Sequence, residues 1–187
     1  MAKAGDVIVN PLSGEQISFD KTGAETNGEY FSGRIVLAPQ GIGPPEHIHP
    51  IIEERFKVVS GKLNALVSGK ERTVAEGEEL IVSPGTPHRW WNTTYDEVHI
   101  EYVVSPALPL DRFLESVFAL SQTGKVNKKG LPSPLRMAPI LQNYWDVLYL
   151  AKPPLFIQKI VMGMLAVVAR LIGYRDEYPY PYERASQ

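Results

Sequence analysis

Residues 41–61 read GIGPPEHIHPIIEERFKVVSG and form the most chemically loaded window of this 187-residue chain. Side chains at positions i and i+2 of a β-strand share one face, so His47 and His49 can direct both imidazoles to one point. Imidazole is the commonest metal ligand among side chains. The spacing of the two histidines therefore predicts two ligands on one metal ion.

A carboxylate follows the histidines. Glu53 and Glu54 are neighbours, so in a strand they point to opposite faces. Glu54 shares its face with Phe56 and Val58, whereas Glu53 shares its face with charged residues. Because the apolar face is the buried one, we expect Glu54 to point inward and Glu53 to be solvated. A buried carboxylate needs a charged or hydrogen-bonding partner, which a metal ion held by two histidines would supply.

A second window, residues 77–92, reads GEELIVSPGTPHRWWN. A glycine turn leads into a short apolar run, and Pro84, Gly85 and Pro87 then bend the chain immediately before His88. Proline fixes φ and glycine permits unusual φ values, so such a cluster makes a sharp corner. We expect His88 to be held on a stiff turn.

Together, the two windows resemble the paired motifs of the cupin superfamily. Residues 41–61 match the first motif, G-x5-H-x-H-x4-E-x6-G, in full. Residues 77–92 match the second, G-x5-P-x-G-x2-H-x3-N, except that Ser83 stands at the proline position and Pro84 follows it. The departure leaves the histidine spacing intact. The resemblance implies four metal ligands, namely His47, His49, Glu54 and His88. Glu54 is also a catalytic candidate. The alternative is a cupin that keeps these residues but holds no functional metal.

The rest of the chain divides into two parts of different character. Before Pro106, short alternating segments bounded by Gly and Pro recur at the roughly 8–12-residue spacing typical of an antiparallel barrel or sandwich. The resemblance implies an all-β cupin jelly-roll barrel over residues 1–106. Residues 107–187 are expected to form a helical extension that packs on the barrel or on a dimer partner, since cupins are commonly dimers.

Helical spacing is clearest in two stretches of the extension. Residues 108–120 predict an amphipathic helix that ends by Gly124, and residues 135–150 predict one or two short helices. Residues 155–172, LFIQKIVMGMLAVVARLI, have about the minimum length for a bilayer span, but Lys159 and Arg170 interrupt them. We expect this helix to pack on protein, with no integral membrane span; peripheral membrane contact is the alternative.

Composition limits the classes of function. The chain has no cysteine, which excludes disulfides, thiolate nucleophiles and sulfur-ligated metals. A net charge of -2 and interspersed charged residues predict no nucleic-acid partner. The N-terminus lacks the apolar run of a secretory signal, so we expect a cytoplasmic protein.

Three imidazoles and a carboxylate suit one divalent transition metal ion, Fe, Mn, Ni, Co or Zn, with open positions for water or substrate. Trp90 shares a face with His88, so Trp90, with Phe56 and Val58 opposite, is a candidate for lining a substrate cavity. Tyr102 is a candidate for a hydrogen bond to substrate. Core packing is the alternative for Trp90 and Tyr102.

His99 and Glu101 alternate with apolar residues on the last expected strand, residues 95–104. They could support the site or transfer protons, but we favour a solvated or interface position. The function favoured by these features is a small metal-dependent enzyme of the dioxygenase-like type acting on a small organic molecule. The alternatives are a non-catalytic metal-containing binding or sensing protein, and a metal-dependent isomerase or decarboxylase.

Overall fold

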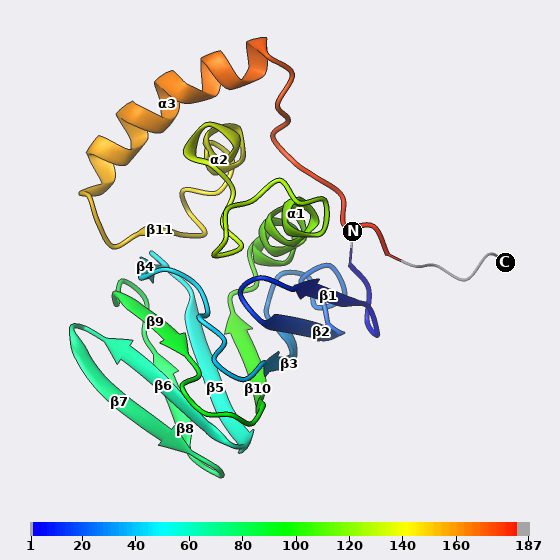
Figure 1. Ribbon diagram of the computed structural model, residues 1–187, viewed down its shortest axis with the longest axis vertical. Helices are drawn as coiled ribbons and strands as arrows, with labels where there is room; N and C mark the ends of the chain where they lie inside the picture. Colours follow the sequence, from blue (N-terminus) through cyan, green and yellow to red (C-terminus); the bar gives the residue numbers. More distant parts are fainter. Residues whose placement is uncertain (1, 183–187) are drawn as a thin grey trace, which may run out of the picture.

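The computed structural model describes residues 2–182, whose strands form two antiparallel sheets (Figure 1). The six-stranded sheet has the order β1 (Val7–Asn10), β2 (Glu15–Lys21), β3 (Phe31–Leu37), β10 (Val98–Ser105), β5 (Glu53–Ser60) and β8 (Glu79–Val82). The five-stranded sheet has the order β11 (Tyr149–Leu150), β4 (His47–Ile48), β9 (His88–Trp91), β6 (Lys62–Val67) and β7 (Lys70–Ala75). The expected β-rich fold is confirmed, as two sheets.

The core lies between these sheets because their strands alternate buried apolar and exposed polar side chains. On β3, Phe31, Ile35 and Leu37 are buried, whereas Arg34 between them is exposed. A glycine interrupts this buried row where β2 approaches most closely: a Cβ on Gly33 would lie 2.0 Å from a backbone oxygen of β2. Period-two patterning therefore determines which face of each strand is buried.

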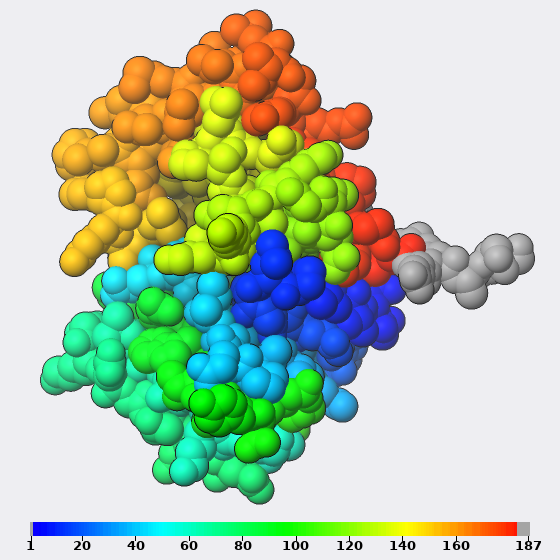
Figure 2. All heavy atoms as spheres, viewed as in Figure 1, coloured from blue at the N-terminus to red at the C-terminus, as the bar shows by residue number. Residues whose placement is uncertain are grey.

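Three helices follow the strands of residues 1–106 and lie on one side of the sheets (Figures 1 and 2): α1 (Leu110–Gln122), α2 (Pro134–Leu141) and α3 (Leu155–Leu171). Helix α1 contacts β1, and α2 packs against α3. The Ser133 side chain caps α2 by accepting a hydrogen bond from the Arg136 amide. The stretch 135–150, expected to hold one or two short helices, holds α2 and ends in β11 (Tyr149–Leu150), which pairs with β4.

Helix α3 uses its small and polar residues for packing. Ala166 and Ala169 are buried, and their small side chains suit the packing of this helix against α2. Gln158 is also buried, and its side-chain amide donates to the carbonyl oxygens of Leu150 and Pro153 at 2.8 and 2.6 Å. Several large apolar side chains of this helix and its C-cap residue, which we expected to pack on the barrel or on a second subunit, are more than half exposed in this single chain: Phe156, Ile160, Met164, Leu171 and Ile172. Within residues 2–182, no helix has the length and apolar character that a bilayer crossing requires.

Candidate metal centre

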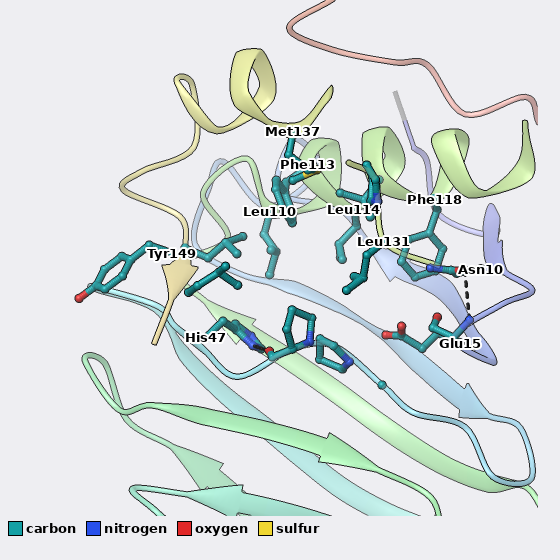
Figure 3. Close-up of a pocket in the computed structure, with 18 of the residues that line it drawn as sticks. Asn10, Glu15, His47, Leu110, Phe113, Leu114, Phe118, Leu131, Met137 and Tyr149 are labelled. Atoms are coloured by element: carbon teal, nitrogen blue, oxygen red, sulfur yellow. Dashed lines mark hydrogen bonds between the residues drawn. The ribbon is translucent and has the colours of Figure 1, made fainter. Parts of the chain in front are cut away.

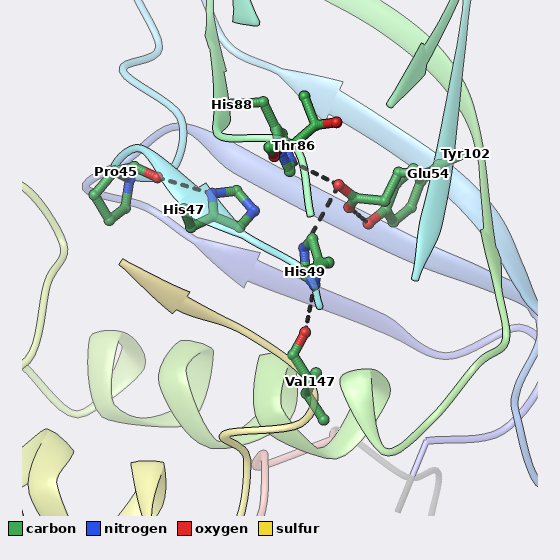
Figure 4. A network of polar contacts seen from close by, with 8 residues as sticks. All are labelled: Pro45, His47, His49, Glu54, Thr86, His88, Tyr102 and Val147. Carbon is green, nitrogen blue, oxygen red and sulfur yellow. Dashed lines mark hydrogen bonds and ion pairs between the residues drawn. The ribbon is translucent and has the colours of Figure 1, made fainter. Parts of the chain in front are cut away.

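The predicted ligands meet in a buried cluster (Figure 4). One potential ligand atom from each of His47, His49, Glu54 and His88 can be chosen so that all lie within 4.8 Å of one another. The cluster forms because His47 of β4 is directly paired with His88 of β9, while Glu54 reaches the same point from the other sheet. The convergence predicted from spacing alone for His47 and His49 is confirmed.

Backbone carbonyls orient all three imidazoles. The Nδ1 atoms of His47 and His88 lie 2.8 and 2.9 Å from the carbonyl oxygens two residues earlier in the chain. The Nδ1 atom of His49 lies 2.6 Å from the carbonyl oxygen of Val147, in the C-terminal part of the chain. A carbonyl only accepts hydrogen bonds, so each Nδ1 carries a proton, and each Nε2 is the atom that faces the cluster and would bind a metal ion.

The two oxygens of Glu54 have different surroundings. The Tyr102 hydroxyl donates a hydrogen bond to Oε1. Oε2 lies 2.7 Å from His88 Nε2 and 3.5 Å from His49 Nε2. Nevertheless, neither Glu54 Oε2 nor His88 Nε2 makes a hydrogen bond of acceptable geometry with any described residue. Unsatisfied buried polar atoms are costly, and a divalent cation among them would satisfy both, so these residues fit a metal ion.

The electrostatics of the cluster suit ligation. Burial alone would raise the pKa of Glu54, but the imidazoles of His49 and His88 outweigh it and hold this pKa well below its usual range. Burial, reinforced by His88 and His49, holds the pKa of His47 well below its ordinary value. An ionised Glu54 and a neutral His47 are the protonation states that metal binding requires. Burial would lower the pKa of His88, but the Glu54 carboxylate outweighs burial and raises this pKa, so a metal ion bound there would displace a proton.

Asn92, the last residue of the second motif, closes a loop and does not touch the cluster. Its side-chain amide donates to the carbonyl oxygens of Ala38 and Asp96, at 3.0 and 2.8 Å, and its Oδ1 accepts from the Thr94 amide at 2.8 Å. These bonds tie the end of β9 to the turn that follows β3. Asn92 therefore positions the strand that carries His88.

A cavity of about 370 Å³ lies between the sheets and the helices, with the histidine cluster at one end (Figure 3). Trp90 and Tyr102, our candidates for substrate contact, line it. Phe56 and Val58 are fully buried but are not among the lining residues; the Phe56 ring stacks on Tyr102 at 4.9 Å. Most of the opposite wall comes from the C-terminal part: Leu110, Phe113, Leu114, Val117, Phe118, Leu131, Met137, Leu141, Leu148 and Met162.

His99 and Glu101 lie on the outer face of β10. Both are exposed, and they form surface ion pairs with Glu97 and Lys57, each at 3.3 Å. The solvated position that we favoured for these two residues is confirmed, and they do not reach the cluster.

Sequence reasoning missed two contributors to the site. Nothing local connects His49 with Val147, because the two residues are 98 positions apart. Glu15, which lines the far end of the cavity, did carry a signal: it alternates with Ile17 and Phe19 on the buried face of β2. A charged residue in a buried period-two row is an indication of function that could have been noted.

The strand-rich part of the chain resembles a known family. Residues 33–105 match the family model described as Cupin domain. No curated protein matches the chain. Solved structures that resemble it include the cupin domain of Cnp3 from Schizosaccharomyces pombe, with 13% identity, a TM-score of 0.45, and coverage of 49% of this chain and 64% of that one.

Two further structures have similar scores. A sugar phosphate isomerase of the cupin superfamily from Silicibacter pomeroyi shows 17% identity and a TM-score of 0.44, with coverage of 50% and 60% of the two chains. KdgF from Halomonas sp. shows 17% identity and a TM-score of 0.43, with coverage of 50% and 81%. This chain spans less than two thirds of the lengths of the first two. The matched residues 33–105 contain both sequence windows and all four clustered side chains, so the site lies within the part of the chain that matches the cupin-domain model.

Proposed function

We propose that this protein is a metal-dependent enzyme of the dioxygenase-like type that acts on a small, largely apolar organic molecule. The observation that carries the proposal is that a buried His/Glu cluster opens onto an apolar cavity of about 370 Å³. Small-molecule sites typically have volumes of about 300–1,000 Å³ and a few convergent polar groups.

The residues of the chain have distinct roles in this proposal. The four clustered side chains would hold one divalent transition metal ion, which supplies Lewis acidity and, if redox-active, reactivity toward dioxygen. Tyr102 keeps Glu54 Oε1 occupied, so that Oε2 faces the cluster. Glu54 is also our candidate for moving a proton at that atom. Trp90 and the helical wall exclude water, which strengthens electrostatic interactions at the site.

The cavity argues against phosphorylated substrates. Its lining, among residues 2–182, contains no lysine or arginine. Lysine and arginine are the side chains that most often pair with phosphate groups. The cavity therefore favours an uncharged or singly anionic apolar molecule over a sugar phosphate.

The test is to purify the protein without exposure to affinity-resin metal, measure its metal content, and follow oxygen uptake by the Fe, Mn, Ni and Co forms with flavonols and enediols. His88→Ala removes a proposed ligand, and His99→Ala removes a surface histidine as the matched control. We expect about one metal ion per chain and metal-dependent oxygen uptake, both lost in His88→Ala and kept in His99→Ala.

Other outcomes would replace the proposal. Metal-dependent conversion of a substrate without oxygen uptake would indicate an isomerase or decarboxylase. A ligand that copurifies and stays unchanged in air with the metal present would indicate a binding or sensing protein. Equal metal content in the two variants would show that the ligand assignment is wrong.

A further inference from the structure

The cavity has a second polar end that the metal centre does not use. In Figure 3, His47 and Glu15 lie at opposite ends of a row of apolar side chains, among them Leu114 and Leu131, which project from α1 and the loop after it. Glu15 begins β2, whereas Glu54 lies on β5, three strand steps away in the sheet order. At about 4.8 Å per step, this is about 14 Å along the sheet.

Two side chains at this second end are available to a ligand. Glu15 and Ser13 are only 6% and 2% exposed, and both line the cavity. Ser13 Oγ makes no hydrogen bond of acceptable geometry with any residue in the described part of the chain. Burial raises the pKa of Glu15 to about 7, although the nearby Ser13 hydroxyl offsets part of that rise. A carboxyl group that is hard to ionise in its buried position and a hydroxyl group without a hydrogen-bond partner thus face a largely apolar space.

The turn that carries these groups is held rigidly. Asn10 Oδ1 accepts hydrogen bonds from the Ser13 amide at 3.3 Å and from the Ser121 hydroxyl at 2.6 Å, and Asn10 Nδ2 donates to the Gly130 carbonyl at 3.3 Å. Asn10 is therefore occupied in joining the turn to α1 and to the loop after it. Glu15 and Ser13 remain, in fixed positions, for contact with a ligand.

We propose that Glu15 and Ser13 form a second polar subsite, and that the substrate is an elongated apolar molecule with a metal-binding oxygen at one end and a hydroxyl group at the other. This inference rests on the proposed function and specifies its substrate class. A hydroxyl suits the subsite because it can donate to Glu15 and accept from Ser13. An ammonium group would have to lose its hydration among apolar side chains.

The test uses calorimetric binding of a series of saturated fatty acids, from octanoate to hexadecanoate, each with and without an ω-hydroxyl group. We expect the ω-hydroxy form of the best-fitting length to bind the metal-loaded protein about tenfold more tightly than the unsubstituted acid. In Glu15→Leu the ratio should fall to about one, and in Ser13→Ala it should fall part of the way. Glu71→Leu, a change at an exposed glutamate of β7, should leave the ratio unchanged.

Equal affinities for the two forms in the wild-type protein, or failure of every acid to bind, would overturn the subsite. A ratio that survives in both Glu15→Leu and Ser13→Ala would do the same. Metal removal separates this test from the proposed function, because it should weaken binding of both forms and leave their ratio unchanged. If metal removal has no effect but the ratio depends on Glu15, the proposed metal function fails while the subsite stands.

Discussion

Replacing Glu15 by glutamine should make the protein more stable at alkaline pH. Burial raises the pKa of Glu15 from 4.5 to about 7, so the folded protein holds this proton more tightly than the unfolded chain does. A difference of about 2.5 pKa units corresponds to about 3 kcal/mol of unfolding free energy. Glutamine keeps the shape of the side chain but never ionises, so the variant avoids this cost.

The sign follows from proton linkage. In the wild type, the stabilisation that comes from holding this proton is fully present well below pH 4.5, where Glu15 is protonated in both the folded and the unfolded protein. It is lost as the pH rises through about 7. The other titratable groups lining the cavity, namely His47, His49, Glu54, Tyr102 and Tyr149, are common to both proteins. Their effects largely cancel when the variant is compared with the wild type at each pH.

Thermal unfolding measured from pH 5 to pH 9 checks this prediction. The melting temperature of Glu15→Gln should exceed that of the wild type by roughly 6–12 °C at pH 8 and above, and the gap should shrink to about a quarter of this value at pH 5. Glu71→Gln, at an exposed position of β7, should show no pH-dependent gap. A constant difference between Glu15→Gln and the wild type across this range would refute the assignment of a raised pKa to Glu15.

Further predictions concern metal affinity, the backbone contact at Gly43 and the oligomeric state. Tyr102→Phe removes the hydrogen bond to Glu54 Oε1 and should weaken metal affinity about 10–100-fold in a chelator competition, and unchanged affinity would contradict the positioning role. Gly43 has φ +59° and a Cβ there would lie 1.9 Å from the Trp90 carbonyl oxygen, so Gly43→Ala should cost at least about 2 kcal/mol of unfolding free energy. Gly69→Ala, at φ +73° with open space around it, should cost only about 1 kcal/mol, and equal losses would refute the steric argument. The homodimer implied by the resemblance stays a prediction; a monomeric mass by light scattering would contradict it.

Local patterns account for the part of the site that could be predicted. His47 and His49 are two positions apart, and Glu54 shares the buried face of Phe56, so strand periodicity alone brings these side chains inward. The helices were predicted for the same reason, since helical spacing is read within a short window. The exposure of the large apolar side chains of α3 was not predicted, because a periodic apolar face does not specify which neighbour, if any, covers it.

By itself, the sequence determined most of the strands and the identity of their buried faces, because each depends on residues only a few positions apart. Only the tertiary structure decided that the C-terminal helices wall the cavity, that Val147 orients His49, and that Glu15 faces the same space as Glu54. The physical reason is that these contacts join segments distant in the chain, so they form only when the sheets and helices pack together.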